Sequence, residues 1–227
     1  MNDRTAFRRI AAITAIISAP LALGASAILA QAIEFNFEVM SNPADLITLG
    51  ARVAGIFRRV EFIGMFGYYL LLIPACLYLW YWLKPQNPKQ VSMYTVFGLG
   101  YIFIGAIGSA VLVSVAPPMM SAYPQALEAQ RAVLEAVFQV VTDLGIVALF
   151  SLSYILGGVW WLGIGLILRV ERRILGIVTV VQGIVTLGYG VGVMLRLEPL
   201  AMLEPLTFFA PIWVMWLGIV IWRHAEK

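Results

Sequence analysis

The residues from Leu144 to Leu168 form a run without a single charged side chain. About 20 such residues in a helix cross a hydrocarbon core of about 30 Å. Similar runs recur along the chain, which is 62% hydrophobic and only 12% charged, whereas soluble domains carry about 25% charged residues. The sequence therefore predicts an all-α, polytopic membrane helical bundle with no separate soluble domain.

Six transmembrane helices in three hairpins are predicted within a single integral membrane domain, residues 1–227. The third span is expected to stop at Pro117-Pro118, because proline lacks the N–H that a helix needs. The expected spans are residues 10–33, 62–83, 91–116, 144–168, 174–195 and 206–222.

Residues 1–32 admit two interpretations. They have the length and apolarity of an anchoring helix. They also have a basic start, an apolar middle and Ala30-Gln31-Ala32, a small-x-small pattern typical of a signal peptide cleavage site. A retained helix and a cleaved signal both stay open.

The basic residues predict the orientation. With six spans, both termini lie on one side, and the turns of that side hold ten of the 15 Lys and Arg residues but only three of the 12 acids. Because Lys and Arg concentrate in cytoplasmic loops, both termini are expected in the cytoplasm. Anionic lipid accounts for this basic surface, and nucleic-acid binding is not implied.

Two amphipathic segments, residues 44–61 and 128–143, precede the second and fourth spans on the predicted outer side. On a helical wheel, the polar residues of the second segment fall within about 120°, and those of the first within about 60°. The side chains expected to line a ligand pocket or form ion pairs are Arg52, Arg59, Glu61, Arg131, Glu135, Gln139 and Asp143.

Some charged residues of the two segments lie at similar numbers of residues from the next cytoplasmic turn. They are therefore predicted at the same depth in the membrane, which suggests ion pairs between the segments. If the helices are neighbours, Arg59 meets Asp143 and Arg52 meets Glu135. Asp143 would then lie roughly 38 Å from the cytoplasmic turns, which is the level of the outer headgroups. Three roles stay open for these charges: joining two helices, lining a ligand pocket, and coupling protons or ions. Glu61 can also pair locally with Arg58, three residues before it.

Small residues recur on two of the spans, as in Gly188-xxx-Gly192 and Gly105-xxx-Ser109. Such residues let helices approach closely, either within the bundle or against a second copy or a membrane partner. Tryptophans in the middle of spans indicate core or lipid contact, or a hydrophobic ligand; they are Trp160, Trp161, Trp213 and Trp216.

Several chemistries lose support. Cys76 and His224 are the only cysteine and the only histidine, so a Cys-rich metal site, a histidine-based zinc site and a bis-histidine haem are excluded. No serine-hydrolase, zincin or Walker motif is present. No catalytic residue, metal or cofactor is expected.

Two stretches carry a family resemblance: Arg9-Ile-Ala-Ala-Ile-Thr-Ala-Ile-Ile, and Leu162-Gly-Ile-Gly-Leu-Ile-Leu-Arg169 followed by Arg173-Ile-Leu-Gly176. With them, the chain resembles an uncharacterised family of bacterial six-helix membrane proteins, a domain of unknown function. The resemblance implies a bacterial inner membrane and supplies no catalytic residues.

The expected function is non-enzymatic binding, or transport, of a lipid or small hydrophobic ligand between the helices, below an ion-paired outer cap. The alternatives are an accessory subunit of a larger membrane complex and a membrane enzyme. That enzyme would use Glu135 and Asp143 as acid and base beside Arg52 and Arg59.

Overall fold

The computed structural model describes residues 3–37, 39 and 42–224, and within these ranges the chain is helical and contains no strand. Five described helical segments are long and apolar enough to cross a membrane, and a sixth results if one bent pair of helices counts as a single span. The predicted all-helical class with membrane-length helices is confirmed. Residues 34–42, which lie between the first predicted span and the first amphipathic segment, fall partly outside the described residues.

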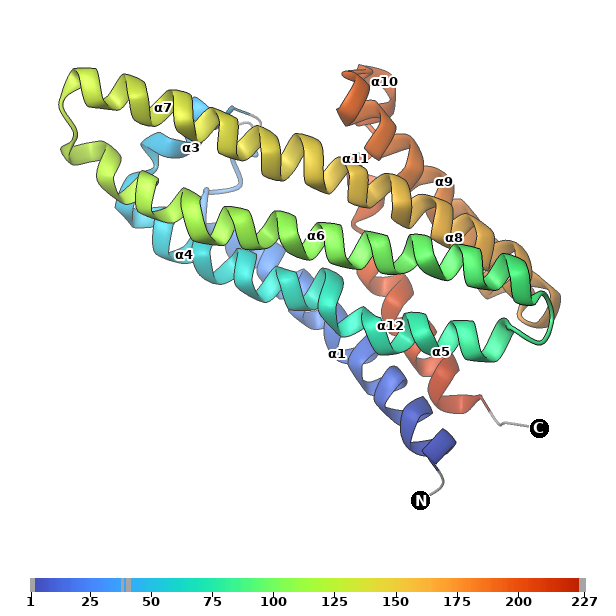
Figure 1. Cartoon of the computed structure of the whole chain (residues 1–227). Coiled ribbons are helices and arrows are strands. Elements are labelled where there is room, and N and C mark those ends of the chain that lie inside the picture. The colour runs from blue at the N-terminus through green and yellow to red at the C-terminus, as the bar shows by residue number, and fades with distance from the viewer. Residues whose placement is uncertain (1–2, 38, 40–41, 225–227) are drawn as a thin grey trace.

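The first and last helices, α1 (Asp3–Ala32) and α12 (Ala210–Arg223), pack together (Figure 1). Ala12 and Ala15 of α1 are fully buried, and a Cβ on Gly218 of α12 would lie 3.0 Å from the carbonyl oxygen of Ala12. Arg8 donates a hydrogen bond to the carbonyl of His224, so the two ends of the described chain meet. The helix α1 therefore supplies part of the core.

A short helix, α3 (Pro43–Thr48), leads into a long helical segment with two irregular turns. At the junction, Gly50 has a φ of +60°, a conformation that glycine adopts readily. The segment consists of α4 (Gly50–Gly64), a π-helical turn η1 (Met65–Tyr69), a 3₁₀ turn η2 (Leu70–Leu72) and α5 (Ile73–Leu83). The predicted first amphipathic segment corresponds to α3 and α4.

The next helix, α6 (Pro88–Ala122), continues through Pro117 and Pro118, so the predicted end of this helix at residue 116 is wrong. Met120, beyond the prolines, is fully buried in a cluster with Phe57 of α4 and Phe138 of the following helix. This packing outweighs the penalty of the two prolines. A 3₁₀ turn, η3 (Tyr123–Gln125), then reverses the chain.

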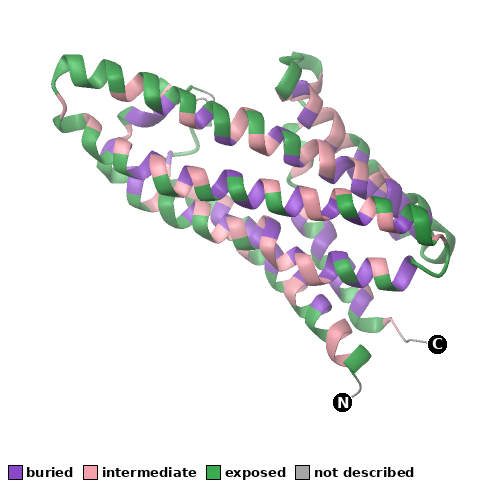
Figure 2. Cartoon of the chain, viewed as in Figure 1, coloured by how far each residue is buried: buried purple, intermediate pink, exposed green. Residues whose placement is uncertain are grey.

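The third long segment joins α7 (Glu128–Thr142), the π-helical η4 (Asp143–Phe150) and α8 (Ser151–Glu171). The predicted second amphipathic segment is α7, which is largely exposed (Figure 2). Its exposed face includes Val133 and Val140, at 62% and 66% exposed. An apolar outward face is the reverse of the arrangement typical of a helix in water.

Glycines bring α8 and α9 (Arg173–Leu195) into close contact. A Cβ on Gly176 would lie 2.3 Å from the backbone nitrogen of Arg169, and one on Gly183 would lie 2.5 Å from that of Leu162. The expected use of small residues for packing within the bundle is confirmed. Their use against a second copy or a partner stays a prediction.

After α9 the chain forms two short helices, α10 (Glu198–Ala201) and α11 (Glu204–Thr207). This pair is bent by 45° from α12. The sixth span, expected to begin at Leu206, is thus divided, and α12 begins at Ala210 with Pro211 in its first turn, where proline is tolerated.

Three of the four tryptophans noted in the spans belong to the core. Trp160, Trp161 and Trp213 are at most 3% exposed, and the rings of Trp161 and Trp213 lie 5.3 Å apart. Their expected core role is confirmed, whereas Trp216 is only partly buried at the edge of the same cluster.

Candidate ligand cavity

A cavity of about 660 Å³ lies between the end of α1, η4, the start of α8, α9 and α11. We call it the main cavity. Its volume is in the range of about 300–1,000 Å³ that is typical of small-molecule sites. Its lining residues are Ser26, Leu29, Ala30, Ile33, Phe37, Pro43, Gln139, Thr142, Asp143, Ile146, Val147, Phe150, Ser151, Tyr154, Tyr189, Val193, Ala201, Glu204 and Phe208.

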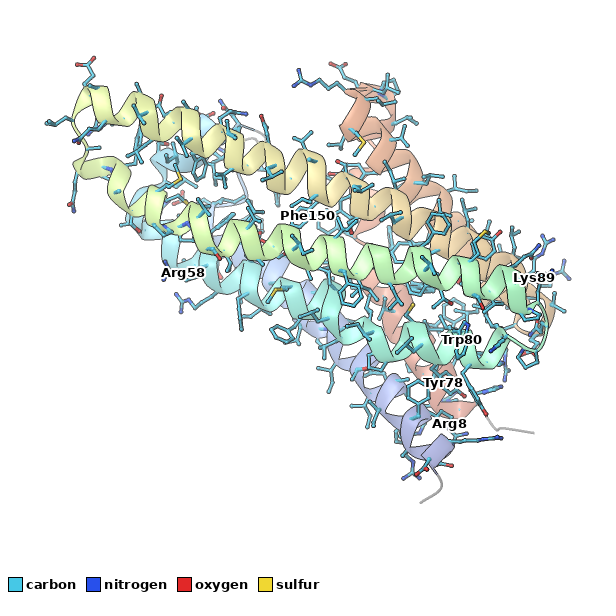
Figure 3. The ribbon with its side chains drawn as sticks, in the orientation of Figure 1. Arg8, Arg58, Tyr78, Trp80, Lys89 and Phe150 are labelled. Carbon is cyan, nitrogen blue, oxygen red and sulfur yellow. The ribbon has the colours of Figure 1, made fainter. Side chains whose placement is uncertain are left out.

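One wall of the main cavity is π-helical. The segment η4 contributes Asp143, Ile146, Val147 and Phe150 to the lining. Phe150, the last residue of this segment, lies beside α6 (Figure 3), and its ring stacks on that of Tyr69 at a centroid distance of 6.2 Å. π-Helical turns occur frequently at functional sites. Here the turn contributes both a carboxylate and apolar side chains to the cavity wall.

The floor of the main cavity is formed where α8 meets α9. The rings of Tyr154 and Tyr189 lie 5.2 Å apart at an interplanar angle of 56°. Ser151, one turn before Tyr154, is 1% exposed. Its hydroxyl has no hydrogen-bond partner in the described part of the chain. A buried hydroxyl without a partner is rare in proteins, and this one belongs to a cavity-lining residue.

The opposite wall is formed by the bent segment after α9, which brings Glu204 and Phe208 to the lining. Two glycines allow this segment to approach α9. A Cβ on Gly188 would lie 2.9 Å from Cδ1 of Leu203, and one on Gly192 would lie 2.6 Å from the backbone nitrogen of Ala201. The Gly188-xxx-Gly192 spacing therefore shapes the cavity wall.

The charged residues of the lining are both acidic: Asp143 and Glu204. Asp143 accepts a hydrogen bond of 3.1 Å from the amide of Gln139. Among the described residues the one ion pair is elsewhere, between Arg52 and Glu34. Among its described lining residues, the main cavity thus has two carboxylates and no cationic side chain.

A smaller cavity of about 90 Å³ continues inward and shares Tyr154, Tyr189, Glu204 and Phe208 with the main cavity. We call it the inner cavity. Trp161 lines it, and the buried indole nitrogen of this residue finds no acceptor within the described ranges. Tyr68 also lines it, and its hydroxyl lies 2.6 Å from the Ser26 hydroxyl on the main cavity's wall. A hydrogen bond between these two hydroxyls therefore joins the linings of the two cavities.

Of the residues predicted from the sequence, Asp143 and Gln139 line the main cavity and the other five do not. Glu135 accepts a hydrogen bond from the hydroxyl of Tyr123. Arg131 donates to the carbonyl of Pro124 at 3.0 Å, with its guanidinium 5.6 Å from the Tyr123 ring centre. These two side chains hold the turn between α6 and α7.

The predicted ion pairs between the two amphipathic segments are not formed. Arg52 pairs with Glu34 at 2.8 Å, and Arg59 donates to the carbonyl of Gly55 in its own helix. The physical reason is the order of packing: α4 lies against α6 and α1, whereas α7 lies against α3 and α6. Arg59 and Asp143 are therefore on helices that do not pack side by side.

The local pair predicted between Arg58 and Glu61 is also not formed among the described residues. Glu61 instead lies near Ser109 of α6, and the Tyr69 ring occupies the space that a Cβ on Gly105 would fill. Gly105 and Ser109 of α6 therefore accommodate two side chains of the preceding segment.

Several cavity residues were missed in the sequence. Tyr154, Tyr189 and Ser151 lie within apolar runs and resemble ordinary span residues. Glu204 falls between two predicted spans, and its place in the cavity lining depends on the bend after α9. The one available signal was the pairing of Glu198-Pro199 with Glu204-Pro205, since proline after a possible N-cap residue is typical of a short helix start.

Among the described residues, no group of three or more His, Cys, Asp or Glu side chains could hold a metal ion. A comparison of the chain with protein families, curated proteins and solved structures finds no match. Function must therefore be inferred from the chemistry of the main cavity.

Proposed function

We propose that this chain is a multi-pass protein of a bacterial inner membrane that binds a lipid or small hydrophobic ligand in the main cavity, without catalysing a reaction. The observation that carries the proposal is the cavity itself, which combines ligand-sized volume, an apolar wall and a few polar groups. Six spans in three hairpins, with both termini cytoplasmic, agree with the charge bias of the turns.

The surroundings of the cavity support a hydrophobic ligand. Near the cavity residues Ser26 and Ala30, α1 exposes the apolar side chains of Leu23 and Ile28. In a bilayer this part of α1 contacts lipid, so an apolar molecule can approach the cavity from the acyl chains. Transport would require a second opening, and binding alone is the simpler proposal.

The two alternatives have weaker support. An accessory subunit would use its glycine faces for a partner, but the glycines of α9 pack against α8 and against the segment after α9. An enzyme with Glu135 and Asp143 beside Arg52 and Arg59 would need these four groups together. In the structure, Glu135 binds Tyr123 and Arg52 binds Glu34.

Native mass spectrometry of the protein released from nanodiscs tests the proposal. We expect a retained small molecule or lipid on the natural chain. The change Ala30→Trp, on the cavity wall, should abolish its retention. The change Leu23→Trp, on the exposed face of α1, is the matched control and should retain it. Equal retention by the natural chain and by folded Ala30→Trp protein, or no retained molecule at all, would contradict the proposal.

A further inference from the structure

We infer that the main cavity selects amphipathic organic cations, in which an ammonium or phosphonium group is attached to an apolar body. This inference rests on the proposed function and adds the charge class of the ligand. Asp143 and Glu204 supply the charge, the aromatic residues of the lining supply the apolar surface, and Ser151, whose buried hydroxyl has no partner among the described residues, belongs to the same lining.

The charge of the cavity is one-sided. Asp143 lies on η4 and Glu204 on α11, so carboxylates come from two different walls. Neither takes part in an ion pair within the described ranges, and no Lys or Arg belongs to the described lining. Both residues are exposed, so a ligand that approaches the cavity from outside can reach them. A cation gains from both carboxylates, and an anion of the same size is repelled by both.

The apolar part of the lining suits a cation for a second reason. Phe150, Tyr154, Tyr189 and Phe208 present aromatic rings to the cavity. The faces of such rings attract cations, and the attraction increases when the cation is desolvated. Quaternary groups cannot donate hydrogen bonds and need a broad, weakly polar surface, which aromatic side chains supply.

An independent observation indicates that the site takes a ligand with polar atoms. Ser151 is 1% exposed and its hydroxyl has no partner in the described structure, yet the residue lines the main cavity. Leaving a buried polar group unpaired is energetically costly. Trp161 repeats the pattern in the inner cavity, where its indole N–H lacks an acceptor among the described residues.

Two probes of nearly equal size and shape and opposite charge test the inference: tetraphenylphosphonium and tetraphenylborate. Their binding to the full chain in zwitterionic nanodiscs is measured by equilibrium dialysis, with empty nanodiscs subtracted. We expect the phosphonium to bind at least tenfold more tightly than the borate. The double change Asp143→Asn and Glu204→Gln should weaken phosphonium binding at least tenfold and reduce the difference between the probes.

Two further variants separate charge selection from cavity binding. Glu198→Gln removes a carboxylate from α10 that does not belong to the described lining, and should leave phosphonium binding unchanged. Ala30→Trp fills the cavity and should abolish it. Melting temperatures within a few degrees of the natural chain confirm that each variant is folded.

The outcomes distinguish the two proposals. If both probes bind equally, or if the double variant binds phosphonium as tightly as the natural chain, while Ala30→Trp abolishes binding, the cavity binds ligands without charge selection and the cation inference is wrong. If Ala30→Trp leaves phosphonium binding unchanged, the ligand lies elsewhere, and the assignment of function to the main cavity is wrong as well.

Discussion

The rings of Tyr154 and Tyr189 lie 5.2 Å apart and join α8 to α9 at the floor of the main cavity. This pair does two things at once. It packs two helices together, and its rings line both the main and the inner cavity. The hydroxyl groups and the rings can be separated experimentally, because phenylalanine keeps the ring and alanine removes it.

Tyr154→Phe should change the free energy of unfolding little, since the ring pair is kept, whereas Tyr154→Ala should cost about 3 kcal/mol. The loss includes burial of the ring and its contact with Tyr189. Reversible unfolding in mixed detergent micelles measures both variants. A stability of Tyr154→Ala equal to that of Tyr154→Phe would show that the ring pair does not join α8 to α9.

Gly176→Ala should destabilise the protein, because the new Cβ would lie 2.3 Å from the backbone nitrogen and 2.4 Å from the Cα of Arg169. Backbone atoms cannot rotate away, so α8 and α9 must separate, at a cost of about 1–3 kcal/mol. Gly24→Ala is the matched control: a Cβ there has no heavy atom within 4 Å. The control should be neutral or stabilising by up to about 1 kcal/mol, as for glycine in a helix interior.

Melting temperatures of the two glycine variants, measured side by side in one detergent, give the comparison. The glycine packing of α8 on α9 is contradicted if Gly176→Ala melts at or above the temperature of Gly24→Ala.

A charge swap between Arg59 and Asp143 should show no coupling. Their helices do not pack side by side, and Arg59 donates to the carbonyl of Gly55. Tyr123 and Glu135 are in hydrogen-bond contact, and a cycle of Tyr123→Phe and Glu135→Gln should give a coupling of about 1 kcal/mol. Rescue of Arg59→Asp by Asp143→Arg would show that these two residues do form an ion pair, and would contradict the helix packing of the structure.

At the other end of the bundle, Trp82 on α5 donates its indole N–H to Glu171 at 2.9 Å. Glu171 also accepts from Gln86 at 2.8 Å, so one carboxylate links the turn after α5 to the end of α8. Glu171→Ala should cost about 1.5–3 kcal/mol, the range for hydrogen bonds to charged groups. Because Gln keeps one acceptor oxygen, Glu171→Gln should cost less.

Unfolding of the two Glu171 variants is compared with that of Glu128→Ala, an exposed acid at the start of α7. Equal stability of Glu171→Ala and Glu128→Ala would mean that the link contributes nothing to the fold.

The sequence predicts the helices well because the length and apolarity of a run decide whether it can cross a membrane. It also predicts that Gln139 and Asp143 share a helix face, and both line the main cavity. The end of α6 was predicted wrongly, because burial of Met120 among residues distant in sequence outweighs a local proline signal.

The partners of the charged residues depend on tertiary geometry that no local pattern contains. Arg52 reaches Glu34 because the chain after α1 passes through two non-glycine residues of positive φ, Glu34 and Phe35. Such conformations are uncommon for these residues. Glu204 reaches the main cavity through the bend after α9, which rests on contacts of Gly188 and Gly192. Helical periodicity predicts neither the course of the chain after α1 nor the bend after α9.

The central claim is that a hydrophobic ligand occupies the main cavity. Photocrosslinking from a benzoylphenylalanine at Val147, on the cavity wall, tests it most directly, with the same probe at Leu23 on the exposed face of α1 as the control. Mass spectrometry of the adducts identifies what each position contacts. We predict one dominant adduct at residue 147 and a mixture of the bulk lipids at residue 23. No adduct at residue 147, or the same bulk mixture at both positions, would contradict the claim.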